Sequence, residues 1–167
     1  MIVIVFGVSG AGKTTIGKLL AGELGWRFLE ADDFHPPSNI EKMRSGHPLT
    51  DEDRWPWLNR LRDQITRSTA AAENAVLACS ALKRAYRERL RVSDDVKFVF
   101  LHGDYTLIEK QLQGRRGHFM NPALLKSQFT DLEEPKLAEG TVIIELGRSP
   151  QELVEEIKAK LSLAKST

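Results

Sequence analysis

The segment MIVIVFGVSGAGKTT, residues 1–15, decides the fold. Its apolar, mostly β-branched run at residues 2–6 is typical of a strand that is buried on both faces of a parallel sheet. The glycine-rich stretch GVSGAGKT, residues 7–14, follows directly and matches the pattern G-x-x-x-x-G-K-[ST]. A helical pattern then continues to about residue 24. A strand, a glycine-rich turn and a helix in this order predict a binding site for the phosphates of a nucleoside triphosphate.

The residue types in this loop have separate physical roles. Glycines let the backbone curl until several N–H groups point at phosphate oxygens, and the helix that follows adds the positive end of its dipole. We expect Lys13 to reach the β- and γ-phosphates of ATP, and the hydroxyl of Thr14 to bind Mg²⁺. The predicted nucleotide contacts are Gly7, Ser9, Gly10, Ala11, Gly12, Lys13, Thr14 and Thr15. The loop alone does not identify a phosphoryl acceptor.

The rest of the chain alternates apolar runs with helical patterns. Strands are predicted at residues 2–6, 27–31, 76–79, 96–101 and 142–146. Helices are predicted at residues 13–24, 38–45, 50–72, 82–91, 104–113 and 122–132, and from residue 149 onward. Capping residues predict helix starts at Ser38, Thr50, Asp104 and Ser149. Short apolar strands separated by helices indicate an α/β fold whose parallel sheet is covered on both faces.

Length and composition restrict the class of protein. The 167 residues suit a single domain, residues 1–167, and a net charge of +1 argues against general nucleic-acid or membrane-surface binding. No apolar run approaches the roughly 20 residues of a membrane span, and Met1 leads into a strand without a signal peptide. By elimination we expect a cytoplasmic protein. The single cysteine, Cys79, lies in an apolar run and is expected to be a small buried residue.

Acidic side chains follow the second predicted strand, in LEADDFH at residues 29–35. Open parallel sheets bind ligands at the carboxyl ends of their strands, and an acceptor hydroxyl needs a base or an orienting carboxylate. We expect Asp32 to be that base, whereas Asp33 is equally well explained as a solvated loop acid. His35 either binds an acceptor hydroxyl or is an ordinary hydrogen-bonded loop residue.

Basic side chains gather in three further segments. Arg54, within TDEDRWPW, either pairs with a surface acid or clamps an anionic substrate, and its tryptophan neighbours are expected to pack. In SALKRAYRERLR, residues 80–91, Lys83 and Arg87 are four apart and share a helix face that suits an anionic acceptor. A solvated helix paired with Glu88 remains the alternative. RNA binding is less favoured because no aromatic platform accompanies these charges.

The segment GRRGHF, residues 114–119, has the composition of a lid. Arg115 and Arg116 are expected to neutralise the transferring phosphoryl group when the lid closes, although a plain basic loop would have the same composition. After the last strand, GRSP places Arg148 and Pro150 where a nucleotide base could rest.

Together these segments resemble the bacterial-type gluconokinases. The resemblance rests on GVSGAGKT, ADDFHPPSNIEKM, GHPLTDEDRWPWL, CSALKRAYRERLR, RRGHF and SQF, and extends to about residue 135. It implies phosphorylation of D-gluconate on its 6-hydroxyl with ATP and Mg²⁺. It also implies a P-loop fold like that of nucleoside-monophosphate and shikimate kinases, a three-layer sandwich with sheet order 2-3-1-4-5. A helical lid at about residues 114–132 and a homodimer belong to the same expectation.

The resemblance also assigns residues. By similarity, Gly10, Gly12, Lys13 and Thr14 hold ATP and Mg²⁺, Asp32 is the acceptor-side aspartate, Arg54 and Lys83 face the substrate, and Arg115 is the lid arginine. Glu30 stands where relatives often carry aspartate, which leaves its contact with Mg²⁺ open. Two alternatives stay in view: a kinase for another small anionic acceptor, such as shikimate, another sugar acid or a nucleoside monophosphate, and a nucleotide-dependent switch without an acceptor.

Overall fold

The structure is a computed structural model that describes residues 1–114 and 122–164. Within these residues, one five-stranded sheet has the order β2-β3-β1-β4-β5, and all four strand pairings are parallel. The strands are β1 (Ile2–Phe6), β2 (Arg27–Glu30), β3 (Ala75–Cys79), β4 (Val96–His102) and β5 (Val142–Glu145). The predicted fold class and strand order are therefore confirmed.

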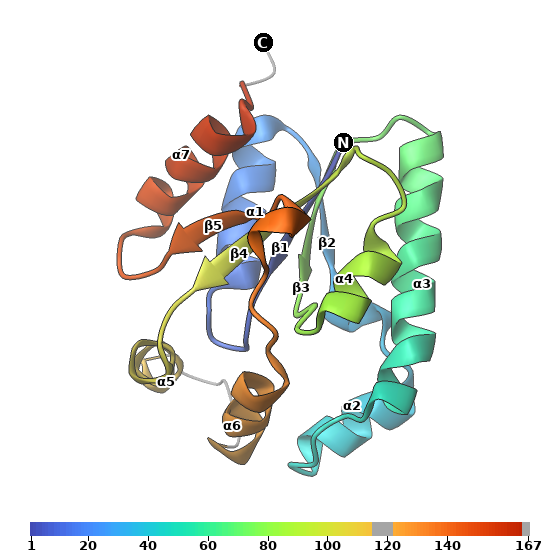
Figure 1. Ribbon diagram of the computed structural model, residues 1–167, viewed down its shortest axis with the longest axis vertical. Helices are drawn as coiled ribbons and strands as arrows, with labels where there is room; N and C mark the ends of the chain where they lie inside the picture. The colour runs from blue at the N-terminus through green and yellow to red at the C-terminus, as the bar shows by residue number, and fades with distance from the viewer. Residues whose placement is uncertain (115–121, 165–167) are drawn as a thin grey trace.

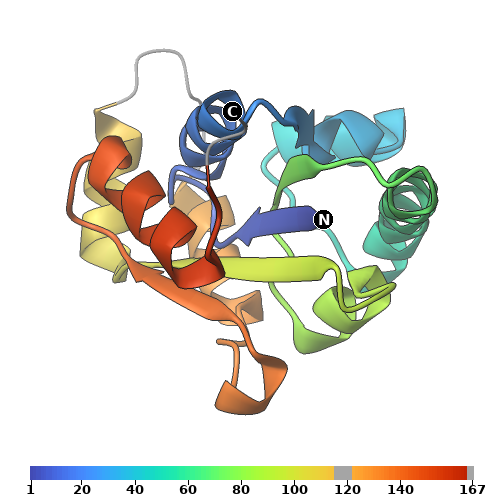
Figure 2. The same cartoon turned by 90° about the horizontal axis from the view of Figure 1, so that it is seen from above.

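Helices cover both faces of the sheet and produce three layers (Figure 1). Helices α1 (Lys13–Leu24) and α7 (Pro150–Leu161) lie on one face, and α3 (Asp51–Ala70) and α4 (Arg84–Leu90) lie on the other. The view from above separates the two helical layers clearly (Figure 2). Strand β1 contributes to both layers, because side chains alternate along a strand: Ile2, Ile4 and Phe6 pack in one core, and Val3 and Val5 in the other.

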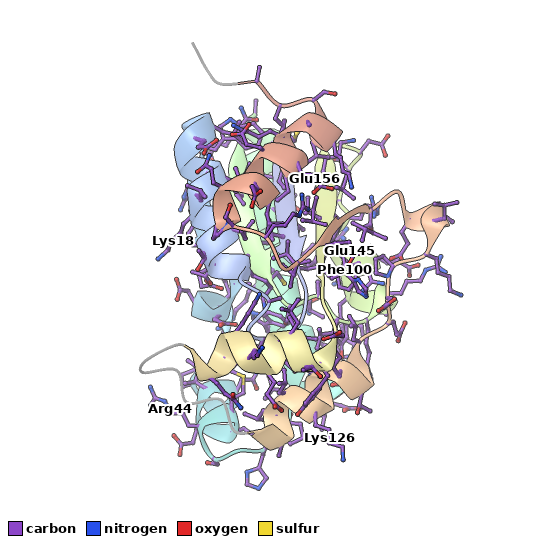
Figure 3. The ribbon with its side chains drawn as sticks, turned by 90° about the vertical axis from the view of Figure 1, so that its left-hand side faces the viewer. Lys18, Arg44, Phe100, Lys126, Glu145 and Glu156 are labelled. Carbon is purple, nitrogen blue, oxygen red and sulfur yellow. The ribbon has the colours of Figure 1, made fainter. Side chains whose placement is uncertain are left out.

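The remaining helices lie at the carboxyl ends of the strands. They are α2 (Pro37–Arg44), α5 (Tyr105–Gln113) and α6 (Pro122–Asp131), with the short 3₁₀ turn η1 (Ala31–Phe34). A second 3₁₀ turn, η2 (Leu137–Glu139), instead precedes β5. Helices α5 and α6 run next to each other below the sheet (Figure 3), where the rings of Tyr105 and Phe129 are 5.3 Å apart. Among the helices described, none has the combination of length and apolar character that crossing a membrane requires.

Most predicted helix starts are confirmed. Thr50 and Ser149 each form a capping box with the residue three positions later, and the Asp104 side chain accepts from the Leu107 amide. Helix α2 differs from the prediction, because it begins at Pro37 without a side-chain cap. The fixed φ of proline suits the first helical position, so Ser38 lies inside the first turn and does not cap it.

Cys79 is 1% exposed in the core beneath α3 and α4, which confirms the prediction of a small buried residue. Burial is the main reason that the pKa of its thiol rises to about 12. The thiol therefore stays protonated at neutral pH and is a poor nucleophile.

Arg87 connects α4 to the chain that follows α6. Its guanidinium is buried and donates to the Glu139 carboxylate at 2.9 and 3.3 Å, to the carbonyls of Ala81 and Leu82 at 3.0 Å, and to the Glu133 carbonyl at 2.9 Å. These five bonds use all five N–H groups of an arginine. Arg87, expected to face the acceptor, is instead directed into the protein interior.

We expect Arg87→Ala to lower the free energy of unfolding by about 3–5 kcal/mol, because the nearly buried Glu139 carboxylate would lose its partner. Arg84→Ala is the matched control, since Arg84 pairs with Glu88 on the exposed surface of the same helix and should cost less than about 0.5 kcal/mol. Urea denaturation at neutral pH measures both values. Similar small losses in the two variants would contradict a structural role for Arg87.

Candidate active site

A cavity of about 710 Å³ lies at the carboxyl edge of the sheet. It is lined by the phosphate loop, by η1 and the segments that flank it, and by α3 and α6. The lining includes Ser9, Gly10, Lys13, Asp32, Asp33, His35, Arg54, Trp57 and Gln128. The fold therefore brings the predicted phosphate site, the predicted base and one predicted anion-binding arginine to a single cavity.

The phosphate loop has a conformation that requires glycine. Gly10 and Gly12 have φ angles of +83° and +95°, in the left-handed region. A Cβ atom on Gly10 would lie 2.5 Å from Cγ of Leu112, so the backbone also needs the space. Helix α1 begins at Lys13 without a side-chain cap, and the start of a helix favours an anion. The loop therefore fits a bound triphosphate.

The ammonium of Lys13 donates to the Val8 carbonyl at 2.9 Å, so its side chain folds back over the loop. The Thr14 hydroxyl donates to the Glu30 carboxylate at 2.5 Å. Burial is the largest influence on Glu30 and raises the pKa of its carboxyl, against the lowering effects of Thr14 and Lys13. The hydroxyl predicted to hold Mg²⁺ thus has a carboxylate beside it, and oxygen ligands of this kind suit that ion.

Of the other predicted loop contacts, Ala11 is buried beneath the loop and Thr15 is exposed on α1. Across residues 1–114 and 122–164, no group of three or more acidic, histidine or cysteine side chains is arranged to hold a metal by itself. A Mg²⁺ ion at Thr14 would therefore take most of its ligands from phosphates and water, as is usual for this ion in kinases.

Asp32 lies in η1, and His35, directly after this turn, lies close to it. The Asp32 carboxylate is 77% exposed at the cavity, and its Oδ1 lies 4.0 Å from Nε2 of His35. His35 itself is buried and stacks on Trp57, with ring centroids 4.3 Å apart. Burial is the main reason that the pKa of His35 falls to about 4, so the ring is neutral at pH 7.

The tautomer of His35 follows from its neighbour. The Asn39 amide nitrogen lies 3.1 Å from Nδ1 of His35 and also donates to the Asp53 carbonyl at 2.8 Å. Because that nitrogen is a donor, Nδ1 is the acceptor and the proton lies on Nε2. His35 therefore presents an N–H toward the cavity side of Asp32.

Arg54 belongs to a charged network that reaches the cavity from α3. It is 8% exposed and donates to the Tyr86 hydroxyl at 3.0 Å, and its Nη2 lies 3.0 Å from the Asp131 carboxylate. The Tyr86 hydroxyl donates a short hydrogen bond to Asp51, which also accepts from Lys83 at 2.9 Å. Arg54 lines the cavity, whereas Lys83 does not.

Other predicted site residues lie elsewhere. Arg148 is on the surface, paired with Glu156, and Pro150 begins α7; neither lines the cavity. Trp57 is buried as expected, but Trp55 is 38% exposed and contacts Tyr86 only edge-on. The predicted lid arginines, Arg115 and Arg116, lie outside the described residues, as does most of the predicted lid that precedes α6.

Sequence reasoning missed two residues of α6. The backbone N–H of Ser9 donates to the Gln128 side-chain oxygen at 2.6 Å, and Asp131 pairs with Arg54. Gln128 stood in the SQF segment that supported the family resemblance, but nothing in its spacing indicated a contact with the phosphate loop. Asp131 carried no sequence signal at all, because its partner comes from a distant helix.

Known proteins resemble this chain over most of its length. Residues 9–162 match the shikimate kinase family model. Gluconokinase of Gluconobacter oxydans is 47% identical over 156 residues, covering 92% of this chain and 87% of that protein. The chain belongs to the gluconokinase family. The thermosensitive gluconokinase of Escherichia coli is 48% identical over 141 residues, or 84% of this chain and 75% of that protein.

Solved structures place the family in its wider fold. A gluconokinase from Sinorhizobium meliloti superposes with a TM-score of 0.87 at 42% identity, covering 96% of this chain and 90% of that one. Shikimate kinase from Acinetobacter baumannii has a TM-score of 0.61 at 21% identity, covering 96% and 93% of the two chains, which shows a shared fold. The gluconokinase family and shikimate kinase thus use the same P-loop architecture.

We expect Gly10→Ala to weaken nucleotide binding by more than about tenfold, because the new methyl group would overlap Leu112 in a strained backbone. Gly22→Ala is the control: an added Cβ there meets nothing within 4 Å and should stabilise α1 by about 0.5–1 kcal/mol without changing nucleotide affinity. Calorimetric titration with a non-hydrolysable ATP analogue measures the affinities. Equal affinity in the wild type and Gly10→Ala would show that the loop tolerates a side chain.

Proposed function

We propose that this protein transfers the γ-phosphoryl group of ATP to the 6-hydroxyl of D-gluconate. The observation that carries the proposal is the shared cavity, which places a phosphate loop, an exposed aspartate and a buried arginine around one space. A kinase for a sugar acid needs these three elements: a site for the triphosphate, a carboxylate for the attacking hydroxyl and a cation for the acid group. The relatives that carry the gluconokinase name supply the identity of the acid.

The loop side of the cavity handles the nucleotide. Backbone N–H groups between Gly7 and Thr15 bind phosphate oxygens, and Lys13 offsets negative charge on the group in transfer. Thr14, with Glu30 beside it, would hold Mg²⁺. When bound, the ion would supply positive charge that offsets the negative charge of the phosphates.

The acceptor side positions gluconate. Asp32 orients the 6-hydroxyl and takes its proton as the oxygen attacks phosphorus, while the bond between phosphorus and the oxygen that ADP retains breaks. The Nε2–H of His35, 4.0 Å from Asp32, is placed to donate to a substrate hydroxyl. Arg54 binds the carboxylate at the other end of the sugar acid. We assign that role to Arg54 in preference to Lys83, because only Arg54 lines the cavity.

Further parts of the proposal rest on the sequence alone. Arg115 and Arg116 neutralise the phosphoryl group in transfer as the lid closes. Arg148 and Pro150, which lie outside the cavity, contact the nucleotide base where it extends beyond the phosphate loop. The protein acts as a cytoplasmic homodimer with one kinase domain per chain.

The test of the proposal is ADP release with Mg-ATP across an acceptor panel of gluconate, shikimate, other sugar acids, AMP and no acceptor. We expect gluconate to stimulate ADP release strongly and the others to have little effect. Stimulation by a different acid would support a kinase activity but contradict gluconate as the substrate. Silence across the panel, with ATP still bound, would favour the nucleotide-dependent switch.

Asp32→Asn should reduce turnover by about 10²–10⁴-fold, since it removes the base but keeps the shape of the side chain. ATP affinity should stay nearly unchanged, because Asp32 lies on the acceptor side of the cavity. Steady-state kinetics and a separate nucleotide titration measure the two effects. Asp33→Asn provides the comparison from the same turn, and a greater loss in that variant would move the role to Asp33.

A further inference from the structure

Two side chains of helix α6 bind residues that line the cavity, one in the phosphate loop and one on α3. The side-chain oxygen of Gln128 accepts a hydrogen bond from the backbone N–H of Ser9 in the phosphate loop, at 2.6 Å. One turn later, the carboxylate of Asp131 lies 3.0 Å from Nη2 of Arg54. Residues three apart share a helix face, so one face of α6 reaches both the loop and the arginine. Figure 3 shows α6 below the sheet.

The two side chains present the chemical groups that the substrates themselves would present. Backbone N–H groups of a phosphate loop bind anionic oxygens, and the oxygen of Gln128 takes one such position. Arg54 is the guanidinium that we assign to the gluconate carboxylate, and the Asp131 carboxylate already holds it. Each contact therefore resembles a bond to a substrate more than a contact that packs a helix.

The position of Asp131 in its helix supports this interpretation. It is the last residue of α6, where the helix dipole disfavours a negative charge. Its side chain is 25% exposed, so it can move into water when another anion arrives. Arg54 is 9% exposed at its side chain and needs an anionic partner at all times, because an unpaired buried charge is strongly unfavourable.

Charges near Arg54 balance only while a single carboxylate binds it. Lys83 and Asp51 form a neutral pair, and Arg54 and Asp131 form a second pair. Tyr86 stays neutral, because burial, followed by its bond to Asp51, raises the pKa of its hydroxyl. His35 is neutral as well. A gluconate carboxylate on Arg54 would place two anions on one cation, so Asp131 must leave.

We propose that Gln128 and Asp131 are internal competitors of the two substrates, and that each is displaced when its substrate binds. The part that concerns Asp131 rests on the proposed function, because it takes the acceptor to be a carboxylate. Helix α6 thereby keeps the buried arginine paired and the loop amide bonded in the empty protein, and it lowers the affinity for each ligand.

Asp131→Asn should tighten gluconate binding by about tenfold, because it removes the competing charge but keeps the size of the side chain. The affinity for a non-hydrolysable ATP analogue should stay the same in that variant. Gln128→Ala should have the opposite effect: the affinity for the ATP analogue should rise severalfold, and the affinity for gluconate should stay unchanged. Isothermal titration of each ligand measures all four values, and thermal melting verifies that each variant is folded.

Glu134→Gln is the matched control, since Glu134 follows Asp131 by three residues but pairs with His102 and not with Arg54. It should change neither affinity. In an Arg54→Met background the effect of Asp131→Asn on gluconate should disappear, which a merely structural role for Asp131 would not require.

Unchanged or weaker gluconate binding in folded Asp131→Asn would overturn the proposal for Asp131, and unchanged analogue binding in Gln128→Ala would overturn it for Gln128. If gluconate fails to bind the wild type, the proposed function fails instead. The nucleotide titration of Gln128→Ala does not depend on the acceptor, so the two failures are distinguishable.

Discussion

The burial of β1 between β3 and β4 is the constraint on which the rest of the protein depends. Its five residues are at most 1% exposed, and the strand pairs along its whole length with both neighbours. A strand held this firmly fixes the position where the chain leaves the sheet. The glycine turn after Phe6 therefore begins at a defined point, and the start of α1, at Lys13, lies at the cavity.

The central position of β1 also explains why the segments after β2 supply Asp32 and Arg54 to the cavity. Strand order places β3 and β2 on one side of β1, so the turn after β2 lies at the same sheet edge as the phosphate loop. Asp32 reaches the cavity because η1 starts directly at that edge. Trp57, which donates to the Ala31 carbonyl at 2.7 Å, then holds this turn against α3. Arg54, one helical turn earlier on α3, is thereby fixed at the cavity.

Local patterns predicted much of this arrangement and failed where a partner was distant. Short apolar runs between helical segments predicted all five strands, and side-chain caps predicted the starts of α3, α5 and α7. Both signals lie within a few residues of sequence. Arg87 was misplaced, because helical spacing shows which face a residue shares but not that Glu139, 52 residues later, will bury it. Lys83 was predicted to face the substrate for the same reason, but its ammonium binds Asp51 and the residue does not line the cavity.

The stacked, buried His35 has a consequence for the conditions in which the cavity works. With a pKa of about 4, the ring keeps the same donor and acceptor pattern from neutral pH down to distinctly acidic pH. In the unfolded chain this histidine is protonated below about pH 6.5, whereas in the folded protein it is protonated only below about pH 4. The free energy of unfolding therefore declines as the pH falls from about 6.5 to 4, although the ring in the folded protein keeps its hydrogen-bonding pattern. The donor and acceptor pattern that His35 presents beside Asp32 is thus insensitive to pH across this range.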